Sequence, residues 1–217
     1  MRNHFKAALF DLDGVVLDTE SQYSIFWGEM GHIYHPDIAH FDQLIKGQTL
    51  TQILDGWFAT MPEVHEELID HLNTFEQQMT FPYIAGADAF VQALRNEGVQ
   101  TAIVTSSNKP KMEQVLRQRP ELTTLFDAIL TAEDFAASKP DPDCYLRAAA
   151  HFQLPASACV VFEDSINGLK AAQASGAVVV GLATTNPRET IRPMADVVID
   201  DFTCFTPTAM QCLAKQH

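Results

Sequence analysis

The sequence has few cysteines, few basic residues and no long apolar run. The four cysteines, Cys144, Cys159, Cys204 and Cys212, form no C-x-x-C pair, which argues against a disulfide-stapled scaffold and against a cysteine-rich metal site. We interpret all four as reduced and structural. The sequence contains no stretch of about 18 consecutive apolar residues, so we expect no membrane-spanning helix.

Basic residues are scarce, since 14 Lys and Arg stand against 28 Asp and Glu and the net charge is −14. The field of such a chain repels polyanions, which excludes nucleic acid and anionic membranes as expected partners. The N-terminal segment reaches Asp11 and Asp13 before an apolar stretch of signal-peptide length develops. We therefore expect a soluble, cytoplasmic protein that is not exported. No sequence feature specifies the oligomeric state, and we favour a monomer.

The 217 residues, 47% hydrophobic and 19% charged, suit one large or two small folded domains. Short apolar runs alternate with segments of helical spacing. The expected strands are residues 6–10, 101–104, 128–130, 159–162, 178–181 and 197–199, and the expected helices are 88–96, 111–118, 142–152 and 168–175. Successive apolar positions are typical of strands covered on both faces. The fold class is therefore α/β, with a Rossmann-like parallel sheet core and right-handed crossovers.

One interval, residues 19–79, breaks this alternation because it contains helical spacing and no strand-like run. Its clearest apolar stripe consists of Val64, Leu68, Leu72, Phe75 and Met79. The sequence therefore predicts two domains: an α/β core formed by residues 1–17 and 84–217, and an inserted all-helical cap domain formed by residues 18–83.

Polar residues follow the expected strands at the positions where open parallel sheets bind ligands. They are Asp11 and Asp13 after the first strand, Thr105 and Ser106 after the second, Glu163 and Asp164 after residues 159–162, and Lys139 in a later loop. Each piece alone has an ordinary explanation as a turn, a helix cap, an acidic first helical turn or an exposed lysine. Their combination at one edge of a sheet predicts a functional site.

Chemistry explains why these residue types belong together. Carboxylates about 4 Å apart repel by roughly 4 kcal/mol per pair at an effective dielectric near 20, so they need a cation, and oxygen ligands favour Mg²⁺. Asp11 can attack phosphorus to form an aspartyl-phosphate, and Asp13 can protonate the leaving oxygen and later activate water. Thr105 and the Ser106 amide would bind phosphate oxygens near a helix N-terminus, and Lys139 would neutralise charge.

The segments 11–19 (DLDGVVLDT), 104–108 (VTSSN), 138–143 (SKPDPD) and 162–168 (FEDSING) together resemble the haloacid dehalogenase-like (HAD) phosphohydrolases, in their β-phosphoglucomutase-like branch with a helical cap. The resemblance covers nearly the whole chain. It implies that Asp11 is the nucleophile, that Asp13 is the general acid/base, and that Thr105 and Lys139 bind the phosphoryl group. It also implies Mg²⁺ held by the Asp11 side chain, the Asp13 carbonyl oxygen and Asp164, with Glu163 close by. The implied activity is hydrolysis of a small phosphorylated metabolite, such as a sugar phosphate.

Cap residues are expected to select the substrate, because lids vary while the core performs the same transfer. Glu20 lies just past the hinge, and the resemblance places the loop of Lys46 and Gly47 over the active site. The alternative for Lys46 is an ordinary solvated lysine. We expect none of the eight histidines to be a ligand.

Other functions fit the motifs less well. A dehalogenase uses the same aspartate without metal, and would need neither Asp13 nor the acidic pair. A phospho-accepting receiver domain is shorter, lacks an insertion and carries its aspartate after a middle strand, and a silent binding protein would not need both Asp11 and Asp13. The main alternative is β-phosphoglucomutase-type transfer between sugar positions. That enzyme has a cap histidine and a phosphate-gripping arginine where this chain has Tyr23 and Leu50, so we predict hydrolysis.

Overall fold

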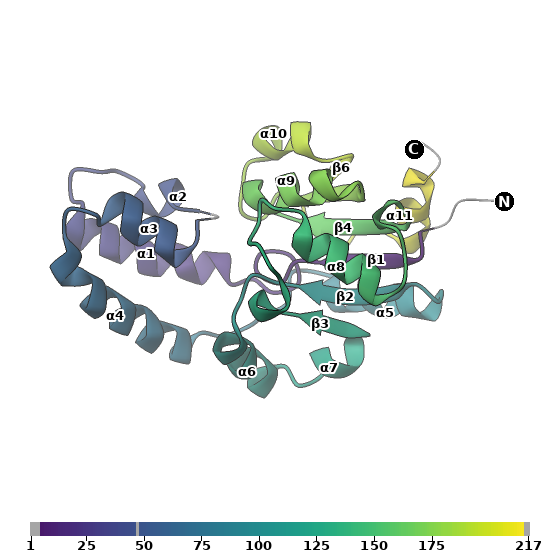
Figure 1. Cartoon of the computed structure of the whole chain (residues 1–217), viewed down its shortest axis with the longest axis horizontal. Coiled ribbons are helices and arrows are strands. Elements are labelled where there is room, and N and C mark those ends of the chain that lie inside the picture. The colour runs from purple at the N-terminus through teal and green to yellow at the C-terminus, as the bar shows by residue number, and fades with distance from the viewer. Residues whose placement is uncertain (1–4, 47, 215–217) are drawn as a thin grey trace. The chain divides into compact units, whose positions relative to one another are not determined.

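The computed structural model describes residues 5–46 and 48–214 and divides the chain into two compact units. The core unit contains the residues up to Asp18 and those from Phe81 onward, and the insertion unit is Thr19–Thr80. Both units are drawn in Figure 1. That the insertion unit works as a cap stays a prediction.

The core unit contains a six-stranded sheet of order β3-β2-β1-β4-β5-β6, with every neighbouring pair parallel. The strands are β1 (Ala7–Phe10), β2 (Gln100–Val104), β3 (Ala128–Leu130), β4 (Cys159–Glu163), β5 (Val178–Leu182) and β6 (Val197–Ile199). The predicted α/β fold with a Rossmann-like parallel sheet is confirmed, and each predicted strand lies within one residue of the observed one.

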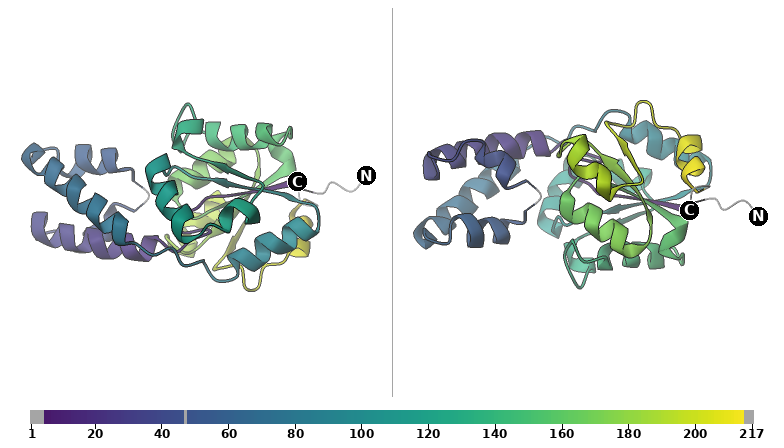
Figure 2. Two further views of the ribbon diagram at one scale, coloured as in Figure 1. Left: turned by 90° about the horizontal axis from the view of Figure 1, so that it is seen from below. Right: turned by 90° about the horizontal axis from the view of Figure 1, so that it is seen from above.

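Helices cover both faces of this sheet, as the layers in Figure 2 show. On one face, Leu9 and Val161 belong to a buried cluster that includes residues of α8 (Asp143–His151) and α9 (Ile166–Ser175). On the other face, Phe10 stacks on Phe162 with ring centroids 4.5 Å apart, and both rings contact Phe90 of α5 (Ala87–Asn96). The alternation of side chains along a strand explains why neighbours such as Leu9 and Phe10 enter different layers.

The remaining helices of the core unit are α6 (Lys109–Gln118), α7 (Leu122–Leu125), α10 (Arg188–Ile191) and α11 (Pro207–Leu213), and the 3-10 turns are Ala132–Asp134, Ala156–Ala158 and Arg192–Met194. Two helices begin two residues before their predicted starts because polar side chains cap them. Asn108 accepts from the backbone N–H of Lys111 at the start of α6, and Ser165 accepts from that of Gly168 at the start of α9.

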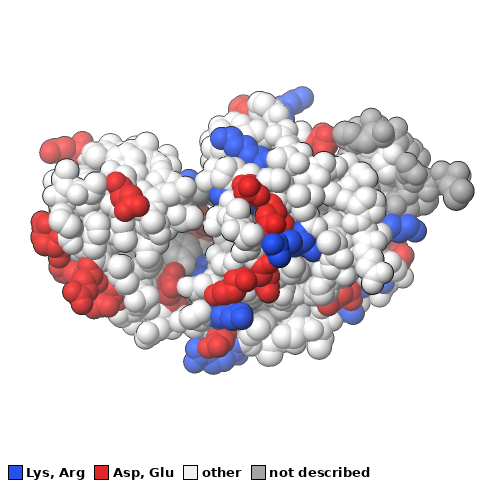
Figure 3. All heavy atoms as spheres, in the orientation of Figure 1, with Lys and Arg blue, Asp and Glu red and all other residues white. Residues whose placement is uncertain are grey.

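The described residues of the insertion unit form helices and no strand. They are α1 (Glu20–Tyr34), α2 (Phe41–Leu44), α3 (Leu50–Trp57) and α4 (His65–Gln78), with a 3-10 turn at Pro62–Val64. Their apolar faces meet in a cluster around Phe26, Phe58 and Leu68. Acidic side chains gather on the surface of this unit where α4 lies (Figure 3). Among the described residues, no helix is long and apolar enough to cross a membrane.

One half-buried histidine packs against the aromatic side chains of the insertion unit. The His35 ring stacks on Phe41 with centroids 4.8 Å apart, and it meets Phe58 edge to face. Its Nε2 is buried and, among the described residues, has no hydrogen-bond partner. Burial lowers the pKa of His35 below its ordinary value.

Candidate active site

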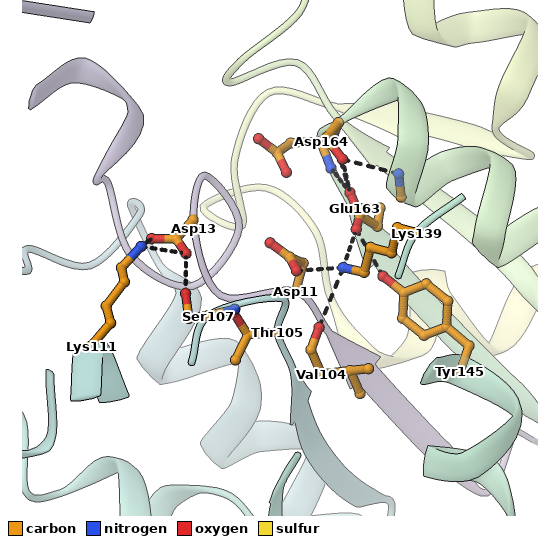
Figure 4. Close-up of polar contacts among 12 residues, drawn as sticks. Asp11, Asp13, Val104, Thr105, Ser107, Lys111, Lys139, Tyr145, Glu163 and Asp164 are labelled. Carbon is orange, nitrogen blue, oxygen red and sulfur yellow. Dashed lines mark hydrogen bonds and ion pairs between the residues drawn. The ribbon is translucent and has the colours of Figure 1, made fainter. Parts of the chain in front are cut away.

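Three adjacent strands position the site by their carboxyl ends. β1 lies between β2 and β4, and Phe10 is in register with Ile103 of β2 and Phe162 of β4. The residues at these ends are Asp11 after β1, Thr105 after β2, and Glu163 and Asp164 at the end of β4. Because the strands are parallel, these residues meet at one edge of the sheet (Figure 4).

Lys139 joins the carboxylate after β1 to the carboxylate of β4. Its Nζ lies 2.5 Å from Asp11 Oδ1 and 2.6 Å from Glu163 Oε1, and it also donates to the Val104 carbonyl oxygen at 3.4 Å. Only 7% of the lysine side chain is exposed. Lys139 is therefore a buried cation that compensates two carboxylates, and the alternative of a solvated surface lysine is wrong.

Glu163 is fully buried, and donors surround both of its oxygens. Besides Lys139, Tyr145 Oη donates to Oε1 at 2.8 Å. Oε2 accepts from the backbone N–H of Asp164 at 2.9 Å, the N–H of Ser165 at 3.0 Å and the Ser165 hydroxyl at 3.1 Å. This arrangement fixes Glu163 as the partner that orients Lys139. A role for Glu163 as a metal ligand stays a prediction.

The helix after Glu163 leaves room for this carboxylate only because it contains a glycine. A Cβ built on Gly168 would lie 1.8 Å from Glu163 Oε1. Any side chain at this position would therefore displace the carboxylate from its donors.

Burial and charge act in opposite directions on these groups. Burial raises the pKa of Asp11 to about 7, against the lowering effect of the Lys139 ammonium and with the help of the neighbouring carboxylates. Burial alone would lower the pKa of Lys139, but the carboxylates of Asp11 and Glu163 outweigh it and hold that pKa well above its ordinary value. Burial, and after it the negative charge of Glu163, raise the pKa of Tyr145, so its hydroxyl stays protonated and remains a hydrogen-bond donor.

Asp13 is bonded to a different lysine. The Nζ of Lys111 lies 2.9 Å from Oδ1 and 2.9 Å from Oδ2, and Ser107 Oγ donates to Oδ2 at 3.0 Å. In Figure 4 the Asp13 carboxylate points toward Lys111 and Ser107, whereas Asp11 points toward Lys139. The two aspartates of one short loop thus occupy different electrostatic surroundings.

Asp164 is held by residues that follow β5. The Thr185 hydroxyl donates to Asp164 Oδ2, and Asn186 Nδ2 donates to the Asp164 carbonyl oxygen at 3.0 Å. Gly14 approaches the same carboxylate with φ +74°, and a Cβ built there would lie 2.1 Å from Oδ2. Glycine is therefore required both by the backbone conformation and by the close approach.

The donor set fits a hard divalent cation. Among the described residues, no group of three or more His, Cys, Asp or Glu side chains is placed to hold a metal ion by itself. Mg²⁺ usually binds one or two carboxylates and completes its shell with waters and phosphate oxygens. Asp11 and Asp164 supply two carboxylates at one edge of the sheet, and the Asp13 carbonyl supplies a third oxygen. The assignment of these residues as Mg²⁺ ligands stays a prediction.

The predicted phosphate-binding residues lie at the end of β2. Thr105 is buried, and its Oγ1 accepts from the Ser107 N–H at 3.0 Å. That bond uses the oxygen as an acceptor, so the hydroxyl proton can be donated to a phosphate oxygen. Ser106 is exposed beside it. These observations favour the predicted roles of Thr105 and Ser106 without testing them.

The predicted cap residues belong to the other unit. Glu20 opens α1, and Lys46 follows α2; both are half-buried in the insertion unit. Gly47 lies outside the described residues. Their roles in substrate binding stay predictions.

Sequence analysis missed four residues that hold the site in place. They are Lys111, Tyr145, Thr185 and Asn186. The rule that polar residues after a parallel strand face the site would have found Thr185 and Asn186, because they follow β5 closely. The other two lie within helices, where no sequence pattern distinguishes a residue at the site from a solvated lysine or a core tyrosine.

Comparison with known proteins identifies the family. Residues 5–176 match the haloacid dehalogenase-like hydrolases. The chain belongs to this family. It is 29% identical over 178 residues to hexitol phosphatase B of Escherichia coli K12, covering 78% of this chain and 79% of that protein. It is also 29% identical to β-phosphoglucomutase of Bacillus subtilis, covering 84% and 85% of the two chains.

Two further similarities concern length and fold. This HAD-like hydrolase is 29% identical to protein SUPPRESSOR OF QUENCHING 1, chloroplastic, of Arabidopsis thaliana over 90% of its own residues, but it spans only 19% of that protein's length. A crystal structure of a HAD hydrolase of family IA, variant 3, from Entamoeba histolytica shares the fold with a TM-score of 0.83, at 23% identity and covering 97% and 99% of the two chains.

Proposed function

We propose that this HAD-like hydrolase is a Mg²⁺-dependent phosphatase that hydrolyses small phosphorylated metabolites through an aspartyl-phosphate on Asp11. The observation that carries the proposal is the separate pairing of two neighbouring aspartates, Asp11 with Lys139 and Asp13 with Lys111. A phosphomonoester needs a nucleophile and a proton donor that occupy different surroundings. Relatives named as phosphatases of hexitols and of pseudouridine 5'-phosphate support the substrate class.

In the first step an Asp11 carboxylate oxygen attacks phosphorus, and the bond between phosphorus and the leaving oxygen breaks. For this step Asp13, whose carboxylate the structure pairs with Lys111, must first take up a proton; it then gives that proton to the leaving oxygen, so the alcohol leaves neutral and Asp13 becomes a carboxylate again. Lys139, bonded to Asp11 Oδ1, fixes the direction of the nucleophile and offsets the negative charge of the incoming phosphoryl group.

In the second step the Asp13 carboxylate takes a proton from water as the water oxygen attacks phosphorus. The bond between phosphorus and Asp11 breaks, inorganic phosphate leaves, and both aspartates return to their starting states. The sum is one ester and one water converted to one alcohol and one phosphate. Thr105 would donate its hydroxyl proton to a phosphoryl oxygen in both steps. Asp11, Asp164 and the Asp13 carbonyl would hold Mg²⁺, which would stabilise charge on the phosphoryl oxygens.

Two residues of the insertion unit favour water over a sugar as the second acceptor. Tyr23, which stands where the mutase has its cap histidine, donates its hydroxyl to Glu76 Oε1 at 2.7 Å. Leu50, which stands where the mutase has its arginine, packs against the apolar cluster of the unit. Neither offers a cation for a second phosphate. With β-glucose 1-phosphate and a bisphosphate primer, phosphorus NMR should show phosphate release outrunning glucose 6-phosphate formation; the reverse order would establish the mutase. The cytoplasmic location stays a prediction from the sequence.

The test begins with a screen of phosphorylated sugars, polyols, short acids and pyrophosphate with Mg²⁺, measured by phosphate release. The Asp11→Asn and Asp13→Asn variants are compared on the best substrate, with Asp88→Asn, an exposed residue in the first turn of α5, as the matched control. We expect no turnover from Asp11→Asn and wild-type turnover from the control. Borohydride reduction of enzyme that was quenched during turnover should modify Asp11. Substantial activity in purified Asp11→Asn would refute the covalent mechanism.

A further inference from the structure

The carboxylate of Asp13 is held by two side chains that have no assigned role in the proposed reaction. Lys111 donates to both oxygens at 2.9 Å, and Ser107 donates to Oδ2 at 3.0 Å. The side chains of Lys111 and Asp13 are only 13% and 18% exposed. This ion pair is therefore partly removed from water, unlike most surface pairs.

The helix that carries Lys111 gives no reason for an ammonium at this position. Lys111 lies in the first turn of α6, where the positive end of the helix dipole disfavours a cation. The Asn108 side chain already accepts from the Lys111 N–H and caps the helix. The charge of Lys111 is therefore explained by the carboxylate that it contacts.

Two donors from different elements hold the Asp13 carboxylate. Lys111 donates to both of its oxygens from α6, and Ser107 donates to Oδ2 from the loop that follows β2. Together they limit the rotation of the carboxylate group.

We propose that Lys111 is a positioning residue for proton transfer, which fixes the orientation of the Asp13 carboxylate. This inference rests on the proposed role of Asp13 as the general acid/base. Lys111 forms no bond to the substrate in the reaction, and the proton still passes from Asp13 to the leaving oxygen.

The consequence depends on the leaving group. An alkyl phosphate releases a strongly basic oxygen that needs a proton as its bond to phosphorus breaks, whereas p-nitrophenyl phosphate releases a stable phenolate that does not. A misdirected Asp13 therefore slows the first substrate and spares the second. A general structural defect would slow both equally.

The experiment measures kcat and KM of Lys111→Met for a hexitol phosphate and for p-nitrophenyl phosphate. We expect kcat for the hexitol phosphate to fall about 10- to 100-fold, with KM and the aryl phosphate kcat within about threefold of wild type. Lys109→Met, an exposed lysine in the same helical turn, is the matched control and should keep wild-type kinetics. Lys111→Gln, a polar replacement, is measured in parallel, and circular dichroism establishes that each variant is folded.

An equal fall for both substrates, or an unchanged kcat for the hexitol phosphate in both Lys111 variants, would overturn the inference. The proposed function fails in a different way. If Asp11→Asn retains turnover, or if Asp13→Asn hydrolyses both substrates at the wild-type rate, the assignment of the aspartates is wrong whatever Lys111 does.

Discussion

Replacing Lys139 with methionine removes the buried ammonium that bonds to both Asp11 and Glu163, while it keeps an unbranched side chain. The variant leaves two neighbouring carboxylates without their cation. Glu163 is fully buried, and the Asp11 side chain is only 12% exposed. Water therefore cannot take over the role of the ammonium.

The magnitude follows from the geometry. At an effective dielectric near 20, charges 2.5 Å apart attract by about 7 kcal/mol. Much of this attraction is offset by the cost of removing the ammonium from water, and loss of one partner of a buried pair destabilises proteins by about 3–5 kcal/mol. We expect Lys139→Met to lower the free energy of unfolding at pH 7 by that amount, which is a large part of the roughly 5–15 kcal/mol of a typical domain. Turnover should be abolished.

The assay is urea unfolding followed by circular dichroism, in the presence of a chelator so that no divalent cation replaces the lysine. Lys170→Met is the matched control, because Lys170 belongs to α9 and is exposed. In the Lys139→Met background, adding Glu163→Gln removes one uncompensated charge and should recover about 1–2 kcal/mol. A loss below about 1 kcal/mol, the range of surface pairs, or a further loss on adding Glu163→Gln, would refute the argument.

Three further predictions concern the metal, a glycine and a histidine. Turnover should require Mg²⁺ and stop in excess chelator or with Ca²⁺, whose larger coordination shell spoils the in-line geometry at Asp11; full turnover in chelator would favour a metal-free reaction. Gly168→Ala should lower the free energy of unfolding by about 1–3 kcal/mol, measured by calorimetry, because its Cβ meets Glu163. Gly56→Ala should raise it by about 0.5–1 kcal/mol, because a Cβ there would meet no atom within 4 Å beyond its chain neighbours and its own helix backbone. Burial lowers the pKa of His35, so the unfolded chain binds a proton at this residue more readily than the folded chain does. The contribution of the neutral His35 ring to stability is therefore present above pH 6.5 and is lost as the pH falls below that value. The free energy of unfolding of His35→Phe should depend less on pH between pH 7 and 5 than that of the wild type.

The sheet was predictable because its strands are covered on both faces. Val178–Leu182 is a run of five buried residues, three of them valines, which is typical of a short strand covered on both faces. The positions of Asp11, Thr105 and Asp164 followed from the same argument, since a residue after a parallel strand has only one edge of the sheet to occupy.

The contacts that orient the catalytic groups were not predictable in this way. Lys111 Nζ meets Asp13 across 98 positions of sequence, and Tyr145 meets Glu163 from a helix whose apolar spacing already accounts for a buried ring. Whether a lysine in a first helical turn points into solvent or toward a carboxylate depends on how the helix packs against the sheet. Periodicity specifies the buried face of a helix, but it does not specify the partner of a polar atom at its border.

The charges at this edge of the sheet give a reason for a bound metal ion that does not depend on similarity to known proteins. Four carboxylates, those of Asp11, Asp13, Glu163 and Asp164, lie at this edge, and the contacts described pair them with two lysines, Lys139 and Lys111. Burial, opposed by Lys139 and helped by the carboxylates of Glu163 and Asp13, raises the pKa of Asp11 to about 7. A divalent cation at this edge would add positive charge beside Asp11 and would let it stay ionised, as a nucleophile must. A chain with a net charge of −14 could then accept a phosphate dianion, because the attraction would be built locally from two lysines and the proposed metal ion rather than from the field of the whole protein.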